Sequence, residues 1–312
     1  MEEYDFIIVG AGVTGLAAAM YGARLEMKTL CLGYGFGTEL PVGGVITTTN
    51  NVENYPGFIK LTGEELAEKI KVHALEYPKV KIKEEKVEKI EKKGKEFIVK
   101  TKENSYRGKT ILFATGTKWR KLEVPGSKDF ENRGIAYCAL CDAPLYKNKV
   151  AAVVGGSDSA VKDALVLAEH AKKVYIIYRG KEIRAEPINL ERIKNKKNIE
   201  VIKETNVVEI KGDTKIREIV LDRAYNGEKT LKLDGIFVAI GHIPLSDLAK
   251  ELGVKLNEKG EIVIDHKDST TNIGGVFAAG DVADKPFKQA ITGVAEGCTA
   301  AHSAFEYIGK KE

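Results

Sequence analysis

Two cysteines that lie two residues apart are the residues with the most distinctive chemistry in this sequence. They are Cys138 and Cys141, in the segment YCALCDAP. Such a pair can be half of a zinc site, a structural disulfide or a working redox pair. A zinc site needs a second pair of ligands, but Cys31 and Cys298 lie singly in a predicted strand and a predicted helix, and the histidines are scattered. The sequence therefore predicts no metal site.

The composition limits where the pair can act. The 312 residues indicate about two domains, and the net charge is only +4. The basic runs also hold acids or amides, so no nucleic-acid partner is expected. No apolar run approaches the ~20 residues of a membrane span, and the acidic N-terminus runs directly into a strand, so we expect a cytoplasmic protein with no membrane partner. The Lys- and Glu-rich charged content of 30% leans towards a thermophilic host.

A redox role for the pair has physical support. Structural disulfides are rare in the cytoplasm. Two intervening residues let the sulfurs meet and part with a small backbone movement, and this spacing commonly lowers the pKa of one thiol towards neutrality. Asp142 follows the pair directly, and its carboxyl can move a proton during exchange if burial raises its pKa. The segment therefore favours thiol–disulfide chemistry.

The N-terminal segment DFIIVGAGVTG predicts a buried strand, a glycine turn and the start of a helix. Gly10, Gly12 and Gly15 match the G-x-G-x-x-G pattern. The first permits a tight turn, the second lets the backbone approach a pyrophosphate, and the third lets the helix pack on the strand. We therefore predict a nucleotide site at the helix N-terminus. The next strand ends in Gly33 rather than an acid, so residues 33–40 would have to hold an adenosine ribose.

Residues 149–180 repeat this plan. Gly155, Ser157 and Ala160 stand in the G-x-G-x-x-A register. The serine side chain occupies the place of closest backbone approach, although its hydroxyl could hydrogen-bond a phosphate. The pattern favours a second nucleotide site, with a purely structural unit as the alternative. Together the two units predict an α/β fold with two Rossmann-like, doubly wound, three-layer domains.

The residues that follow the last strand of the 149–180 repeat bear on the choice of nucleotide. That strand ends in Tyr178, with no acid for a ribose hydroxyl, and Arg179, Lys181 and Arg184 follow. Positive charge there suits a 2′-phosphate, which favours NADPH over NADH. A solvated basic turn is the alternative.

Five motifs follow one another along the chain: GAGVTG, ATG, CALC, GGSDSA and GGVFAAGDVAD. Their order and spacing resemble the low-molecular-weight thioredoxin reductases, the class II pyridine nucleotide-disulfide oxidoreductases, over nearly the whole chain. The resemblance implies a homodimer whose FAD-binding domain comprises residues 1–115 and 245–312. Residues 116–244 would form an inserted NAD(P)H-binding-like domain that carries the cysteine pair. The larger glutathione-reductase-like class is excluded, because no cysteine lies between residues 31 and 138 and the chain is too short.

The resemblance also implies which residues contact the cofactors. Asp281 would accept a hydrogen bond from the ribitol chain of FAD. It follows a strand at the carboxyl end of a sheet, where ligands of this fold bind, and a helix N-cap is the alternative. The other implied FAD contacts are Gly10, Gly12, Gly15, Gly43, Gly44, Thr47, Thr48, Asn54, Ala114, Thr115, Gly116, Gly280, Gln289 and Ala290. The implied nucleotide contacts are Gly155, Gly156, Ser157, Ala160, Arg179 and Arg184.

By the same resemblance, Cys138 is the interchange thiol, Cys141 faces the flavin and Asp142 is the acid–base group. A donor would reduce FAD, and two electrons would pass to the disulfide. Cys138 would then attack a disulfide of a small thioredoxin- or glutaredoxin-like protein, and Cys141 would resolve the mixed disulfide. Rotation of the inserted domain about links near residues 115–120 and 241–247 would present the pair to flavin and partner in turn.

Several positions depart from the family pattern. CALCDAP replaces CATCDG, Gly180 replaces one of two paired arginines, and Ser157 and Tyr178 alter the nucleotide site. We expect NAD(P)H to remain the donor, because two glycines, an alanine and two arginines of that site persist. The alternatives are the same reductase driven by ferredoxin or a deazaflavin, or a flavin-bearing redox sensor or binding protein without fast turnover.

Overall fold

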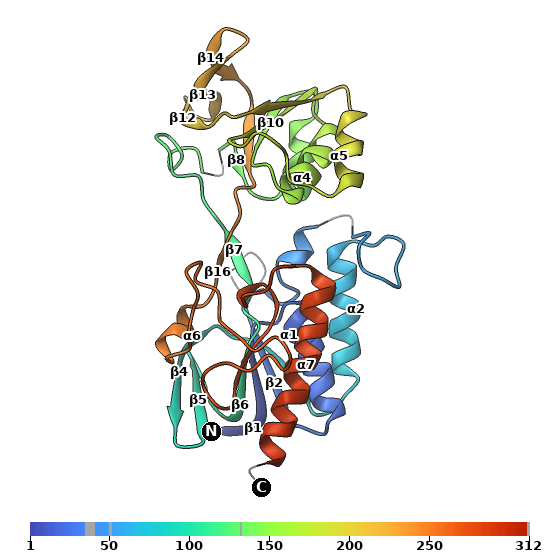
Figure 1. The fold of residues 1–312 in the computed structure, drawn as a ribbon, viewed down its shortest axis with the longest axis vertical. Helices are drawn as coiled ribbons and strands as arrows, with labels where there is room; N and C mark the ends of the chain where they lie inside the picture. The colour runs from blue at the N-terminus through green and yellow to red at the C-terminus, as the bar shows by residue number, and fades with distance from the viewer. Residues whose placement is uncertain (35–40, 50–51, 132, 311–312) are drawn as a thin grey trace. The chain divides into compact units, whose positions relative to one another are not determined.

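The computed structural model describes residues 1–34, 41–49, 52–131 and 133–310 (Figure 1). The chain divides into two compact units. The first is formed by Met1–Lys118 and Ile243–Glu312, and the second by Trp119–His242. The second unit is thus inserted in the sequence of the first.

The first unit is built on a parallel sheet with an antiparallel extension. Its strands are β1 (Glu2–Val9), β2 (Thr29–Gly33), β3 (Val80–Glu84), β4 (Val87–Lys93), β5 (Glu96–Thr101), β6 (Ser105–Phe113) and β17 (Val276–Ala278). Its helices and 3₁₀ turns are α1 (Val13–Arg24), η1 (Val45–Thr48), α2 (Gly63–Leu75), α6 (Asp247–Glu251), η3 (Gly280–Val282) and α7 (Ala290–Gly309). The strand order is β3-β2-β1-β6-β5-β4, with β17 paired to β6. Of the pairs described in this sheet, β4–β5 and β5–β6 are antiparallel and the others are parallel.

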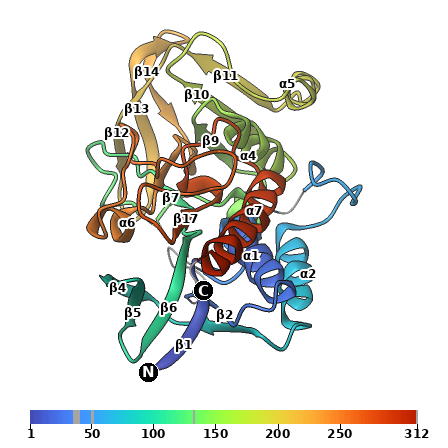
Figure 2. The same ribbon diagram turned by 60° about the horizontal axis from the view of Figure 1, so that its bottom comes forward.

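Alternation along β1 explains how this unit is layered. Phe6 and Ile8 face a core shared with α1 and α7, whereas Ile7 and Val9 face a second core shared with β5 and α6. All four side chains are buried, as expected for a parallel strand that is covered on both faces. Figures 1 and 2 show α1, α2 and α7 together on one face of the sheet. The packing brings the carboxyl ends of β1, β6 and β17 to one edge, beside the start of α1.

The second unit has the same plan on a smaller scale. Its elements are β8 (Ile135–Ala136), α3 (Ala139–Asp142), η2 (Ala143–Tyr146), β9 (Val150–Val154), α4 (Asp158–Ala168), β10 (Lys173–Tyr178), α5 (Pro187–Lys194), β11 (Ile199–Lys203), β12 (Val207–Gly212), β13 (Ile216–Tyr225), β14 (Glu228–Lys232) and β15 (Gly235–Val238). The parallel sheet has the order β11-β10-β9-β15-β8, and β12-β13-β14 form a separate antiparallel sheet.

Alternation along β9 sets the layers of this unit. Ala151 and Val153 pack in a core with α4, whereas Ala152 and Val154 pack in a core with β12 and β13. The parallel sheet therefore lies between a helical layer and an antiparallel β layer. Both units contain the strand, glycine turn and helix that the sequence predicts.

Two short strands lie where the chain passes between the units. They are β7 (Thr117–Trp119) and β16 (His242–Pro244), which pair with each other as a two-stranded sheet. Within the described part of the chain, no helix combines the length and the apolar character needed to cross a membrane.

Candidate functional site

The first glycine turn has the geometry that a nucleotide needs. Gly10 follows β1 with φ at +111°, in the region that favours glycine. A Cβ on Gly10 would collide with the Ala114 carbonyl, and a Cβ on Gly15 would collide with the Gly10 carbonyl. Both glycines are therefore needed for the close approach of β1, β6 and α1. The hydrogen bond from the Ala114 N–H to the Val9 carbonyl, at 2.8 Å, fixes this approach.

A second close contact between backbone segments lies beside the first, where residues 43–44 approach residues 11–12. The Gly43 N–H donates to the Ala11 carbonyl at 2.8 Å, and a Cβ on Gly44 would come within 2.9 Å of the Gly12 Cα. Here α1 begins after Gly12 with no side-chain cap and no acidic residue in its first turn. An uncapped helix start with bare glycine backbone offers N–H groups to an anion. These features fit the pyrophosphate of FAD.

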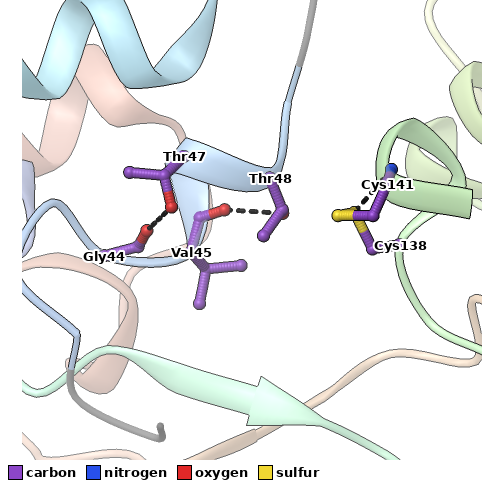
Figure 3. Close-up of a disulfide and its surroundings, with 6 residues drawn as sticks. All are labelled: Gly44, Val45, Thr47, Thr48, Cys138 and Cys141. Carbon is purple, nitrogen blue, oxygen red and sulfur yellow. Dashed lines mark hydrogen bonds between the residues drawn. A yellow bond between two sulfur atoms is a disulfide. The ribbon is translucent and has the colours of Figure 1, made fainter. Parts of the chain in front are cut away.

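Other implied FAD contacts of the first unit are held by local hydrogen bonds. The Thr47 hydroxyl donates to the Gly44 carbonyl at 2.8 Å, and the Thr48 hydroxyl donates to the Val45 carbonyl at 2.7 Å (Figure 3). The Asn54 side chain donates to the Gln289 side chain at 2.9 Å. This bond joins two implied contacts that are 235 residues apart. The predicted ribose loop, residues 33–40, lies mostly outside the described residues.

The remaining implied contacts of this unit cluster at the strand ends. Ala114 and Thr115 follow β6, and the Thr115 hydroxyl donates to the Leu245 carbonyl at 2.6 Å. Gly116 has φ at +65°. Gly280 and Asp281 lie in η3, which is separated from the end of β17 by one residue. Ala290 begins α7, directly after Gln289, which is the N-cap residue.

The second glycine turn is more crowded. Gly155, with φ at +148°, fits closely, because a Cβ there would collide with the Ala239 carbonyl. The Tyr178 ring, however, packs against both Gly156 and Gly180, where a Cβ would overlap the ring atoms. Aromatic carbon thus covers the face of the turn on the side where the sequence places an adenosine ribose.

Charged and polar groups also differ between the two turns. Ser157 is the N-cap of α4 and accepts a hydrogen bond from the Ala160 N–H at 3.5 Å, so its hydroxyl already has a structural role. Asp158 stands in the first turn of α4. Burial opposes ionisation of Asp158, but hydrogen bonds from Lys162, Asn189 and the Glu186 N–H outweigh it and lower the pKa. A carboxylate therefore lies at the helix start that would receive a pyrophosphate, a feature the sequence analysis missed.

The two implied arginines of this turn have different settings. The Arg184 N–H donates to the Gly156 carbonyl at 2.7 Å, and Arg184 forms a parallel bridge with Ser157. Arg184 thus lies beside the glycine turn. Arg179 directly follows β10, and both arginines are exposed.

The cysteine pair forms a disulfide in the second unit. Cys138 and Cys141 are bonded with a Cα–Cα distance of 5.4 Å, and both lie at the short helix α3 (Figure 3). The Cys141 N–H donates to the Cys138 Sγ at 3.1 Å. An N–H aimed at a sulfur favours its thiolate form, because it places positive charge beside the anion.

Asp142 closes α3 next to the pair. Burial raises the pKa of its carboxyl above the ordinary value. Tyr146 lies close enough that Asp142 contributes, after burial, to raising the tyrosine's pKa to about 12. A carboxyl that holds its proton to higher pH than usual is suited to donate and accept one during thiol exchange.

The other two cysteines take no part in this pair. Cys31 is buried in β2, where burial raises the pKa of its thiol to about 12. Cys298 is half-buried in α7 and is free. Among residues whose positions the structure describes, no group of three or more His, Cys, Asp or Glu side chains is arranged to hold a metal ion.

A family model described as pyridine nucleotide-disulphide oxidoreductase matches residues 4–297. The chain belongs to this family. It is 38% identical over 311 residues to a "34.2 kDa protein in rubredoxin operon" of Clostridium pasteurianum, covering 99% of each chain. It is 35% identical over 311 residues to the thioredoxin reductase of Mycolicibacterium smegmatis, covering 99% of this chain and 98% of that one. The crystal structure of Lactococcus lactis thioredoxin reductase matches with a TM-score of 0.92 and 37% identity, covering 98% of this chain and 99% of that one.

These similarities confirm the predicted resemblance to the low-molecular-weight thioredoxin reductases. They also confirm the predicted fold class of two Rossmann-like domains. The family is one of oxidoreductases, so the prediction that the chain is an enzyme is confirmed as well.

Proposed function

We propose that this enzyme is a flavin-dependent thioredoxin reductase. The observation that carries the proposal is the Cys138–Cys141 disulfide, which lies beside an aspartate whose pKa burial raises. The first unit complements it with an uncapped helix start at a glycine turn that fits FAD. The electrons would come from NAD(P)H, and the acceptor would be a thioredoxin-like protein.

The residues of the first unit would hold FAD as follows. The turn of Gly10, Gly12 and Gly15 would bind the pyrophosphate at the start of α1. Asp281 would bind the ribitol chain, and the paired Asn54 and Gln289 side chains would lie at the flavin. Bound FAD supplies the means to accept a pair of electrons and pass it to a disulfide.

The cysteines would then act in two exchange steps. Two-electron reduction of the disulfide leaves Cys138 and Cys141 as thiols. The Cys138 thiolate attacks one sulfur of the partner's disulfide, and the other partner sulfur leaves as a thiolate and takes a proton. The Cys141 thiolate next attacks the Cys138 sulfur of the mixed disulfide, which releases the dithiol partner and re-forms the original bond. Asp142 carries the protons.

Replacing Asp142 with asparagine should slow disulfide reduction by about 10²-fold, the lower end of what a general acid–base group contributes. The pKa of Asp142 is raised, so its acid form persists to higher pH than that of an ordinary aspartate. The rate in the unaltered enzyme should therefore change with pH as this carboxyl titrates. Rates of partner reduction measured across pH should lose that step in Asp142→Asn. An unchanged rate and pH profile would show that Asp142 has no such role.

We propose NADPH as the preferred donor, with NADH used less well. By the family resemblance, Arg179 and Arg184 would lie at the place of a 2′-phosphate. Loss of a charge-assisted hydrogen bond costs about tenfold in affinity. An anaerobic titration of flavin absorbance with each nucleotide tests this. Equal bleaching would remove the preference. Bleaching by neither, with reduction by dithionite intact, would point to ferredoxin or a deazaflavin as donor.

Asp158→Asn should lower the NADPH concentration needed for half-reduction by about threefold to tenfold. The reason is that a carboxylate at a helix N-terminus repels the phosphates that the helix dipole attracts. Asparagine can still accept the hydrogen bonds from Glu186 and Asn189 that Asp158 accepts. Asp213→Asn removes a carboxylate from an exposed turn between β12 and β13 and is the matched control. A higher or equal requirement in Asp158→Asn would contradict this account of the second turn.

The setting of the enzyme is also proposed from the family resemblance and the composition. We propose a cytoplasmic homodimer that reduces a small thioredoxin- or glutaredoxin-like protein in a thermophilic host. Light scattering of the purified enzyme tests the dimer. Turnover with each class of partner tests the acceptor, and the temperature midpoint of unfolding tests the thermophilic origin.

A further inference from the structure

The turn that carries Asp281 is held from one side by a charged pair inside the first unit. Glu296, on α7, accepts a hydrogen bond from the Gly280 N–H at 2.9 Å. Its other carboxylate oxygen lies 3.5 Å from the Lys285 Nζ, and both side chains are only 14% exposed. Solvent screens such a pair poorly. The Glu296 carboxylate therefore attracts the Gly280 N–H and Lys285 more strongly than an exposed carboxylate would.

Lys288 holds the same turn from the other side. Its ammonium donates to the Asp281 carbonyl at 2.6 Å and to the Ala283 carbonyl at 3.0 Å. It also lies 2.7 Å from a carboxylate oxygen of Glu261. Lys288 directly precedes Gln289, which bonds to Asn54. The lysine therefore ties the Asp281 turn to the segment proposed to lie at the flavin edge.

The backbone beneath the turn leaves it little room to shift. Gly280 has φ at +75°, and a Cβ there would come within 2.7 Å of the Thr14 hydroxyl. On α7, Gly293 and Gly297 also approach Thr14 so closely that a Cβ on either would collide with it. The Gly280 peptide thus lies between α1 and α7, and Glu296 is the side chain that binds its N–H. The direction of the next residue, Asp281, follows from that peptide.

We propose that Glu296, together with Lys285, is a positioning residue for the Asp281 turn and thereby sets how tightly the first unit holds FAD. The inference rests on the proposed function, because Asp281 is a proposed FAD contact. Glu296 acts through Gly280 and not by touching the cofactor. The role was not evident in the sequence, where Glu296 is one of two acids in a helix rich in small residues.

The charge on Glu296 gives this role a measurable pH dependence. Burial raises the pKa of Glu296, against the Gly280 hydrogen bond and Lys285, and Asp281 adds to the rise. As the pH falls, Glu296 therefore takes up a proton earlier than an ordinary glutamate and loses its attraction to Lys285. FAD affinity should weaken in the same range. The other charged groups at this turn are Lys288, Glu261, Asp284 and His266.

Glu261 does not share this behaviour. Burial opposes its ionisation, but hydrogen bonds from Lys288 and Asn257 outweigh burial and lower its pKa. It therefore keeps its charge to lower pH than Glu296 does. As the pH falls, the first loss of FAD affinity is therefore expected from Glu296 and not from Glu261.

The test is the dissociation constant of FAD for the full chain, measured by flavin fluorescence between about pH 5 and pH 8. Glu296→Ala should weaken FAD binding by about tenfold, the cost of a lost charge-assisted hydrogen bond. Glu296→Gln keeps an acceptor for the Gly280 N–H, so it should weaken binding less and flatten the pH profile. Glu306→Gln removes the carboxylate that pairs with Lys310 at the far end of α7, and it should change neither quantity.

Two results would overturn the inference. One is a Glu296→Ala chain that binds FAD as tightly as the unaltered chain, and the other is a Glu296→Gln chain with an unaltered pH profile. If Glu296→Ala fails to fold, Lys285→Met decides instead. We expect it to weaken FAD binding and to move the pH dependence to higher pH, because Lys285 lowers the pKa of Glu296. Unchanged binding would contradict the proposal. An unaltered chain that binds no FAD would overturn the proposed function as well, whereas binding that ignores Glu296 overturns the positioning role alone.

Discussion

Cys141→Ser is expected to lower the rate of partner-disulfide reduction by about 10³-fold or more, because removing a member of a catalytic unit removes nearly all of its turnover. Cys138 and Cys141 share the disulfide, and a serine in place of either leaves the electrons no disulfide to enter. Cys138→Ser should have the same effect. The measurement is the formation of free thiols in thioredoxin with donor in excess, while reduction of the flavin by dithionite should be unaffected.

Cys298→Ser is the matched control for these variants. Cys298 is a free cysteine in the first unit, so its loss should leave turnover close to that of the unaltered enzyme. Turnover of Cys141→Ser within about tenfold of the unaltered enzyme would contradict the proposed exchange steps. If the cysteine variants changed only the binding of a partner, the enzyme would instead behave as a flavin-bearing redox sensor.

Gly10→Ala is expected to destabilise the first unit by about 2–5 kcal/mol and to yield protein depleted of FAD. The backbone conformation of Gly10 costs a residue with a Cβ about 1–2 kcal/mol, and the collision of that Cβ with the Ala114 carbonyl adds about 1–3 kcal/mol of overpacking. The strands β1 and β6 and the start of α1 would have to move apart. Chemical denaturation gives the free energy of unfolding, and the visible absorbance of the purified protein gives its FAD content.

Gly94→Ala separates the cost of the backbone conformation from the cost of the collision. Gly94 lies between β4 and β5 with φ at +61°, and a Cβ there would meet no atom of the described residues within 4 Å. It should therefore show the conformational cost alone, about 1–2 kcal/mol, with full FAD content. Equal effects of the two substitutions would mean that the close approach at Gly10 carries no weight.

Features set by neighbours in sequence were the ones that the sequence could predict. The strand, glycine turn and helix that contain Gly10 and Gly155 depend on local apolar runs and on glycine spacing, and the structure has them at those places. The proximity of Cys138 and Cys141 also follows from their spacing. The partners of the first turn are distant in sequence. The family resemblance implied only that Gly44 contacts FAD, and its close approach to Gly12 came from the structure.

Features that depend on contacts between distant segments were missed. Glu296 binds the Gly280 N–H from 16 residues away, and nothing in its helix pattern distinguishes it from a surface acid. Tyr178 was noted for the acid it replaces, but its packing against Gly156 depends on how β10 lies beside β9. Asp158 was also missed. A first-turn aspartate is favourable at any helix start, so its effect on a bound phosphate becomes apparent only from its position at the second glycine turn.

The most direct test of the central claim is a single-turnover measurement under anaerobic conditions. Enzyme reduced with two equivalents of NADPH per flavin, so that both the disulfide and the flavin are reduced, or with dithionite if NADPH fails, is mixed with oxidised thioredoxin. Flavin absorbance and thioredoxin thiols are followed together. The account predicts that the flavin re-oxidises as two thiols appear per electron pair, and that Cys141→Ser shows neither change. Flavin that stays reduced in the presence of thioredoxin and of other small protein disulfides would contradict the assignment as a disulfide reductase.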